Sequence, residues 1–164
     1  MKMSKTKKRI LFVCLGNICR SPAAEGVMRK MVTEAGQESL YHIDSAGIGD
    51  WHVGQLPDRR MRQCGAERGY RFDSHARQFD RRHDFTDFDW IFVMDDANLK
   101  AITSMASDDA ERAKVRKLSD FLTTHSGAQS VPDPYYGGTK DFEYSLDLIE
   151  EACRNLLEKN LLSV

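Results

Sequence analysis

The chain has 164 residues, of which 41% are hydrophobic and 30% are charged. This size and balance are typical of one globular domain that needs no disulfide framework to bury a core. The formal net charge of −1 argues against nucleic-acid binding driven by overall charge, so any site for an anion has to be local.

We expect a flexible basic tail over residues 1–8 and a single domain over residues 9–164. The tail and the apolar run after it resemble a signal peptide only superficially. The run is short, and it leads into the start of a helix rather than into a small-residue cleavage site. No stretch approaches the roughly 18 apolar residues of a membrane span. The sequence therefore predicts a cytoplasmic protein that binds neither membrane nor nucleic acid.

The first predicted element is a buried parallel strand, formed by the apolar run from Ile10 to Val13. Residues 23–31 predict a helix. Cys14 follows the apolar run at the strand's end, five loop residues come next, and Arg20 stands just before the predicted helix.

This strand–loop–helix unit predicts a site for a tetrahedral anion. Ser21 is suited to be the N-cap of the helix and Pro22 its first residue, so unpaired amides with a partial positive charge face the loop. Gly16 lets the backbone approach closely, and Arg20 offers a planar fork that matches phosphate oxygens. The same positive field favours the thiolate form of Cys14. We expect the anion to be bound by the loop residues Leu15, Gly16, Asn17, Ile18 and Cys19.

A competing interpretation makes Cys14 a small buried hydrophobic residue, which is the commoner role of a cysteine after an apolar strand. The Cys-x5-Arg spacing alone also arises by chance. The glycine, the helix cap and the strand–loop–helix context together favour the anion site. The glycine patterns of nucleoside-triphosphate and dinucleotide loops are absent from it.

The four cysteines predict neither a metal site nor a disulfide framework. Cys14 and Cys19 lie five apart, unlike a Cys-x2-Cys metal pair, and Cys64 and Cys153 form no second pair. We therefore expect no metal and no other cofactor, and thiols that the cytosol keeps reduced.

The next predicted strand, Tyr41 to Gly47, completes a β–α–β unit with parallel strands. Ser45 and Gly47 should then lie near the first loop, at the carboxyl edge where such sheets bind ligands. A glycine-rich segment over residues 48–57 follows and carries Trp51. The tryptophan ring either packs over the core or forms part of a recognition surface, and the sequence supports both interpretations equally.

The rest of the chain continues the alternation of helices and strands. It predicts helices over 58–69, 97–106 and 141–162, a short helix or loop over 79–88, the start of another short helix at 107–111, and strands over 90–94 and 115–118. The predicted fold class is α/β: one doubly wound domain with a four-stranded parallel sheet and helices on both faces.

Asp133 lies between Pro132 and Pro134, which stiffen the backbone on both sides of its carboxyl group. Proline, aspartate and glycine are also common in ordinary turns, so this stretch alone is a weak signal. Thiolate attack on a phosphate monoester needs an acid that protonates the leaving group and then activates water, and Asp133 could supply it. Tyr135 and Tyr136 follow and offer flat faces for an aryl group.

The two motifs, Cys14 to Ser21 and Asp133 to Tyr136, closely resemble those of the low-molecular-weight protein tyrosine phosphatases. The resemblance extends from about Lys8 onward and includes Asp44–Gly47, Asp50-Trp51, Ser74–Gln78 and Met94-Asp95. It implies an enzyme that hydrolyses phosphotyrosine in proteins, or small aryl phosphates, and releases inorganic phosphate without a cofactor.

The resemblance also implies roles for single residues. Cys14 would be the nucleophile that forms a phosphocysteine intermediate, and Arg20 would bind the phosphate together with the loop amides. Asp133 would act as general acid and then as general base. Cys19 matches a second cysteine of the family loop, which can trap an oxidised Cys14 as a reversible disulfide.

Other positions resemble supporting parts of the family site. Asn17, Ser21, Ser45 and His75 resemble a network that holds the loop in shape, although only the resemblance distinguishes His75 from an ordinary histidine. The walls of the entrance would come from Trp51 and Tyr135, with Tyr136 as a further candidate.

Two alternatives remain beside this interpretation. An arsenate reductase shares the fold and the cysteine loop, but it needs a close pair of redox cysteines, which Cys64 and Cys153 do not form. A phosphate-binding module without catalysis would be expected to lack Cys14 or Asp133, and both are present.

Overall fold

The computed structural model describes residues 7–162 and contains the predicted four-stranded sheet. Its strands are β1 (Lys8–Cys14), β2 (Tyr41–Gly47), β3 (Trp90–Val93) and β4 (Val115–Lys117). They lie in the order β2-β1-β3-β4, and each neighbouring pair is parallel. The predicted α/β fold class is confirmed. None of the helices within residues 7–162 has the combined length and apolar character that a membrane span requires.

The helices are α1 (Arg20–Glu34), α2 (Arg59–Glu67), α3 (Asp84–Asp87), α4 (Asp96–Met105), α5 (Asp109–Ala113) and α6 (Thr139–Glu158). Two single 3₁₀ turns, η1 (Glu38–Leu40) and η2 (Leu118–Phe121), precede β2 and follow β4. Asp58 and Asp95 cap α2 and α4, because their carboxylates accept backbone N–H groups of the first turn. The last helix ends at Glu158, earlier than predicted.

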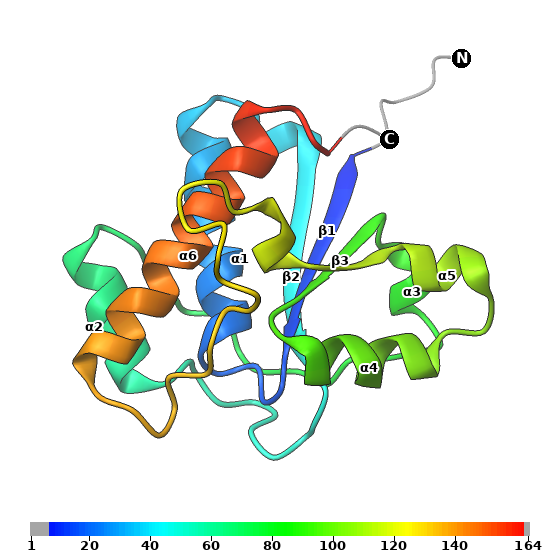
Figure 1. The fold of residues 1–164 in the computed structure, drawn as a ribbon, viewed down its shortest axis with the longest axis horizontal. Helices are drawn as coiled ribbons and strands as arrows, with labels where there is room; N and C mark the ends of the chain where they lie inside the picture. Colours follow the sequence, from blue (N-terminus) through cyan, green and yellow to red (C-terminus); the bar gives the residue numbers. More distant parts are fainter. Residues whose placement is uncertain (1–6, 163–164) are drawn as a thin grey trace.

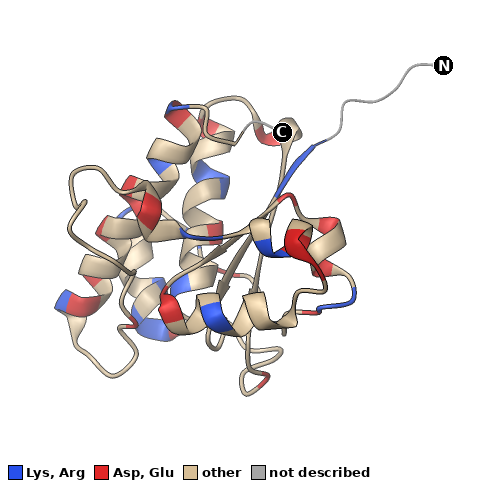
Figure 2. Cartoon of the chain, turned by 45° about the vertical axis from the view of Figure 1, so that its right-hand side comes forward, with Lys and Arg blue, Asp and Glu red and all other residues tan. Residues whose placement is uncertain are grey.

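Each face of the sheet carries its own hydrophobic core, because successive side chains of β1 point to opposite sides. Ile10 and Phe12 belong to one core, together with residues of α1, α2 and α6. Leu11 and Val13 belong to the other, together with residues of α3 and α4. Figure 1 shows α1, α2 and α6 on one side of the strands and α3, α4 and α5 on the other. Figure 2 shows Lys, Arg, Asp and Glu mixed along the outer helices.

The predicted start of the first helix is wrong. The helix α1 begins at Arg20, so Ser21 lies inside its first turn and Pro22 is its third residue. The N-cap position belongs to Cys19, which makes no side-chain capping bond. The hydroxyl of Ser21 is used elsewhere, since it contacts the sulfur of Cys14.

The predicted tail over residues 1–8 extends too far toward the C-terminus. Lys8 already pairs with Tyr41 in the sheet. Residues 1–6 lie outside the described residues.

Candidate active site

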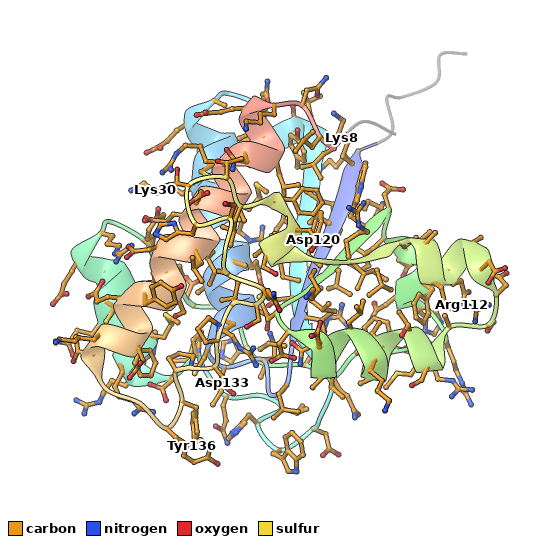
Figure 3. All side chains as sticks on the ribbon, viewed as in Figure 1. Lys8, Lys30, Arg112, Asp120, Asp133 and Tyr136 are labelled. Carbon is orange, nitrogen blue, oxygen red and sulfur yellow. The ribbon has the colours of Figure 1, made fainter. Side chains whose placement is uncertain are left out.

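A pocket of about 330 Å³ lies at the carboxyl edge of the sheet, where β1 leads into α1. Figure 3 shows Asp133 and Tyr136 at the same end of the molecule as the turn that follows β1. The pocket is lined by Cys14, Leu15, Gly16, Ile18, Cys19, Arg20, Trp51, His52, Asp133, Tyr135 and Tyr136. The fold therefore joins the two motifs that lie far apart in the sequence. We name residues 14–21 the cysteine loop and residues 131–136 the Asp133 loop.

In the cysteine loop, backbone carbonyl oxygens are hydrogen-bonded within the protein, whereas backbone N–H groups are available to a ligand. Its carbonyl oxygens are occupied by neighbouring segments: Ile48 N–H donates to Cys14, Gly49 N–H to Leu15 and Asp58 N–H to Ile18, at 3.0, 2.9 and 2.7 Å. Within the described residues, the N–H groups of positions 15–19 have no protein partner. Together with the N-terminus of α1, these donors are suited to a tetrahedral anion.

The end of β2 presses directly against this loop. A Cβ atom at Gly47 would lie 2.9 Å from the carbonyl carbon of Gly16 and 3.0 Å from the backbone nitrogen of Asn17. Any larger residue at this position would push the loop away, so glycine sets its position.

Cys14 lines the same pocket, and the residue is 2% exposed. The Ser21 hydroxyl lies 2.9 Å from the sulfur, and the Ser21 N–H lies 3.4 Å from it. A thiolate has no proton to give, so in that form both groups of Ser21 donate to the sulfur. Such hydrogen bonds favour the negative charge that a nucleophile needs.

Asn17 connects the loop to the strands behind it. Its side-chain amide donates to the hydroxyls of Ser21 and Ser45, at 2.8 and 3.0 Å. Its carbonyl oxygen accepts the backbone N–H of Arg77 at 2.9 Å. The Ser45 hydroxyl in turn donates to the buried carboxylate of Glu25 at 2.6 Å. The side chain of Asn17 thus supports the loop from behind and does not line the pocket.

Arg20 is a buried cation with its charge aimed at the pocket. Its guanidinium donates to Asp95 at 2.7 Å and to the carbonyl oxygen of Val131 at 2.9 Å. A second nitrogen lies 3.5 Å from the carboxylate of Asp133. Burial alone would lower the pKa of Arg20, but Cys14, Asp95 and Asp133 outweigh it and raise that pKa. The guanidinium therefore stays charged at the pocket.

The Asp133 loop forms the opposite wall. The Asp133 carboxylate accepts the N–H of Tyr135 at 3.1 Å and keeps 38% of its side chain exposed. Arg60 holds the loop from the side of α2, because it donates to the Tyr135 carbonyl oxygen at 3.0 Å and lies over the Tyr135 ring at 5.6 Å. The ring of Tyr136 meets that of Tyr135 edge-on at 4.9 Å and is 95% exposed.

The loop after β2 supplies the outer rim. Trp51 is 64% exposed and lies over Gly49, where a Cβ atom would come within 2.1 Å of the indole ring. The tryptophan ring is therefore not packed into the core, and it lines the pocket. His52 beside it lines the pocket, with its ring 6.4 Å from that of Tyr135.

The other thiols are protonated core residues. Burial raises the pKa of Cys64 to about 11 and also raises that of Cys153. Cys19 lines the pocket, but burial and then Asp58 raise its pKa as well. All four cysteines are unpaired. In the part of the chain that the structure describes, no three His, Cys, Asp or Glu side chains are grouped to hold a metal ion.

Comparison with known proteins agrees with this geometry. Residues 9–162 match the family described as low molecular weight phosphotyrosine protein phosphatase. The chain belongs to this family. A Synechocystis protein named as a low molecular weight protein-tyrosine-phosphatase is 47% identical over 149 residues, covering 91% of this chain and 94% of its own. The low molecular weight phosphotyrosine protein phosphatase of Sus scrofa is 40% identical and covers 93% and 95%.

A solved structure is similar along nearly the whole chain. The protein tyrosine phosphatase of Entamoeba histolytica superposes with a TM-score of 0.89 at 44% identity, covering 94% of this chain and 97% of that one. The match to the low molecular weight phosphatase family spans residues 9–162, and the chain is a phosphatase.

One residue predicted from the family resemblance lies outside the network. His75 is exposed and makes no side-chain hydrogen bond within the described residues. The chain path around residue 77 explains this, because the backbone N–H of Arg77 takes the position beside Asn17.

Sequence reasoning also missed several residues that shape the phosphatase pocket. Asp95 orients Arg20, and its position directly after the third predicted strand was the available signal. His52 follows Trp51 in the glycine-rich loop. Arg60 and Glu25 lie on predicted helices, where nothing in the local pattern marks them.

Proposed function

We propose that the chain hydrolyses phosphotyrosine and small aryl phosphate monoesters through a phosphocysteine intermediate. The observation that supports this most is that Cys14, the cysteine loop, Arg20 and Asp133 line one pocket, and that the N–H groups of positions 15–19 have no partner among residues 7–162. A nucleophile, an oxyanion site and an acid are thus present in one cavity.

In the first step the Cys14 thiolate attacks phosphorus and forms an S–P bond. The P–O bond to the phenolic oxygen breaks, and Asp133 gives that oxygen its proton. The N–H groups of the cysteine loop and the fork of Arg20 stabilise the charge on the three equatorial oxygens.

In the second step a water molecule attacks phosphorus and transfers a proton to the Asp133 carboxylate. The S–P bond breaks and its electron pair returns to Cys14 as a thiolate. Inorganic phosphate leaves, and Asp133 is again protonated for the next cycle.

The walls of the pocket favour an aryl leaving group. Trp51, Tyr135 and Tyr136 all line the pocket, and the Tyr136 ring meets that of Tyr135 edge-on. Flat aromatic faces pack well against a phenyl ring and give no advantage to an alkyl phosphate.

Two alternatives have less support. A thiol relay of the arsenate reductase kind would need a second reactive thiol near Cys14, whereas burial raises the pKa of Cys19, Cys64 and Cys153 and keeps these thiols protonated. A purely binding module would have no use for Asp133. The mechanism needs Cys14 reduced, which supports a cytoplasmic location.

The test is hydrolysis of a phosphotyrosine peptide and of p-nitrophenyl phosphate in the presence of EDTA. We expect wild type to release phosphate, Cys14→Ser to release none, and Asp133→Ala to be slowed by about 10²–10⁴-fold. Rapid quenching of Asp133→Ala should reveal a phosphoryl group on Cys14 by mass spectrometry. No phosphate release by wild type with Cys14 confirmed reduced would overturn the proposal.

A further inference from the structure

Asn17 is held in an unusual backbone conformation behind the pocket. Its φ is 58°, a left-handed value that asparagine adopts more readily than most non-glycine residues because its short polar side chain can hydrogen-bond nearby. The support comes from its side-chain bonds to Ser21, Ser45 and the backbone N–H of Arg77. Because Asn17 also fixes the Ser21 hydroxyl at the Cys14 sulfur, whatever holds Asn17 acts on the nucleophile.

Arg77 is itself fixed by both its side chain and its backbone. Its Nε donates to Asp44 at 3.0 Å, and its two terminal nitrogens donate to the two oxygens of Asp84 at 3.0 and 3.2 Å. Its carbonyl oxygen accepts the N–H of Gly47 at 2.8 Å. The backbone N–H that reaches Asn17 therefore belongs to the most firmly anchored residue of its segment.

Asp84 makes this anchor rigid. Its side chain is 5% exposed, and it also accepts the backbone N–H of Asp80 at 2.7 Å. Burial alone would lower the pKa of Arg77, but Asp84 and Asp44 outweigh it and raise that pKa. The guanidinium stays charged, and its bonds to Asp84 and Asp44 join α3 and β2 to the segment that contacts the cysteine loop.

We propose that Arg77 is a positioning residue for the phosphatase reaction. Its guanidinium, held by Asp84 and Asp44, fixes the backbone N–H that keeps Asn17 left-handed and thereby keeps the Ser21 hydroxyl on the Cys14 sulfur. This role rests on the proposed function, in which Cys14 is the nucleophile.

The role requires an arginine rather than any cation. A planar fork can bond both oxygens of Asp84 and still reach Asp44, whereas a lysine ammonium is a single point that cannot do both. Arg77→Lys therefore keeps the charge and removes the geometry. Arg68→Lys is a matched control, because Arg68 also bridges several carboxylates, those of Glu143, Asp147 and Glu150, between α2 and α6.

The experiment measures kcat and KM for p-nitrophenyl phosphate, thermal unfolding, and alkylation of Cys14 by iodoacetate at about pH 6 and about pH 9. In Arg77→Lys we expect kcat to fall about 10-fold, within the ~100-fold that a misplacement of about 1 Å can cost, while KM changes little. The alkylation rate at the lower pH, relative to that at the higher pH, should fall as well, because the thiolate loses its hydroxyl donor. Arg68→Lys should lose thermal stability without either kinetic change.

The proposal is overturned if Arg77→Lys keeps the wild-type kcat and alkylation ratio and only unfolds at a lower temperature, as the control does. If Arg77→Lys does not fold, Asp44→Asn removes one anchor and leaves Asp84 in place, and it must show the same fall in the alkylation ratio. A wild type that hydrolyses no phosphate ester would refute the proposed function and with it the role of Arg77 in the reaction; a lower alkylation ratio in Arg77→Lys would then show only that Arg77 positions Ser21 at the Cys14 sulfur.

Discussion

The two loops that meet at the pocket are held in very different ways. In the cysteine loop, Asn17, Ile18 and Cys19 are at most 8% exposed, and hydrogen bonds from several elements surround them. In the Asp133 loop, the Asp133 side chain is 38% exposed and Tyr136 is 95% exposed. The middle of the cysteine loop is buried, although Leu15 is 45% exposed, whereas the Asp133 loop is exposed at Asp133 and Tyr136 and buried at Val131.

This difference matches what each loop has to do in the proposed reaction. Donors that stabilise a transition state act best when they are already in place, since moving them would cost energy during the reaction. The acid has to serve two steps and let phosphate leave, so some freedom of movement is useful there. The Asp133 loop is accordingly attached at a few points, among them Arg20 on Val131 and Arg60 on Tyr135.

The largest effect is expected at Arg20, which belongs to the first loop and holds the second. Arg20→Lys should lower kcat/KM by about 10³-fold or more, because an ammonium group cannot bind the phosphate and also donate hydrogen bonds to Asp95 and Val131. Steady-state kinetics with p-nitrophenyl phosphate measures the loss.

The same substitution should also lower the free energy of unfolding by about 2 kcal/mol or more, since Asp95 loses a buried partner. Denaturant unfolding of the variant gives this value. A variant within about 10-fold of wild-type kcat/KM would show that a positive charge at position 20 is enough for the reaction and that the planar guanidinium geometry is not required.

The contrast between the loops also explains how far the sequence could predict the structure. The strands were predictable because each is a short apolar run, and the pocket was predictable because Cys14 and Asp133 each follow local signals, a strand end and a pair of prolines. The range 41–47 for the second strand is confirmed residue by residue.

The sequence could not predict which residue from a distant part of the chain contacts the cysteine loop. His75 and Arg77 lie two residues apart on an irregular segment, and only the path of the backbone decides that Arg77 meets Asn17. The start of α1 was mispredicted for a related reason, because the contact between Ser21 and the Cys14 sulfur overrides the usual capping preference of serine.

An intermediate effect is expected where the chain leading to the Asp133 loop is anchored on α6. Glu151 accepts N–H groups of Thr123 and Thr124 and contacts the His125 ring at 2.6 Å. Burial opposes its charge, but the bonds from His125 and these N–H groups lower the pKa of Glu151 from 4.5 to about 2. Glu151→Gln should therefore lower the free energy of unfolding by about 2 kcal/mol near neutral pH.

The sign of the pH dependence follows from that lowered pKa. The carboxylate contributes stability above its unfolded value near 4.5, and the contribution is lost as pH falls toward 2. The difference in the free energy of unfolding between wild type and Glu151→Gln should be constant above about pH 5 and should disappear in acid. Urea unfolding at several pH values measures this difference. Glu158→Gln changes an exposed residue of the same helix and should leave the free energy of unfolding equal to that of wild type. The kcat of Glu151→Gln should stay near wild type, because the anchor is remote from the pocket.

The smallest effect is expected at Arg60, the contact that holds the Asp133 loop from outside. Its guanidinium lies 4.7 Å from the Phe142 ring centre and also donates to the Tyr135 carbonyl oxygen. Arg60→Met keeps apolar cover over both rings and removes the hydrogen bond to Tyr135 together with the ion pair to Asp58. Loss of the Tyr135 bond should lower kcat by about 3–10-fold, the value of one ordinary hydrogen bond.

Arg59→Met provides the control, because Arg59 is exposed and makes no ion pair within the described residues. If the Asp133 loop is lightly held, Arg60→Met should change kcat while unfolding stays within about 0.5 kcal/mol of wild type. A large loss of stability with unchanged kcat would mean the opposite, that Arg60 holds α2 to the domain and the Asp133 loop positions itself. The position of the Asp133 carboxyl group would then need another explanation, in which Pro132 and Pro134 alone orient it.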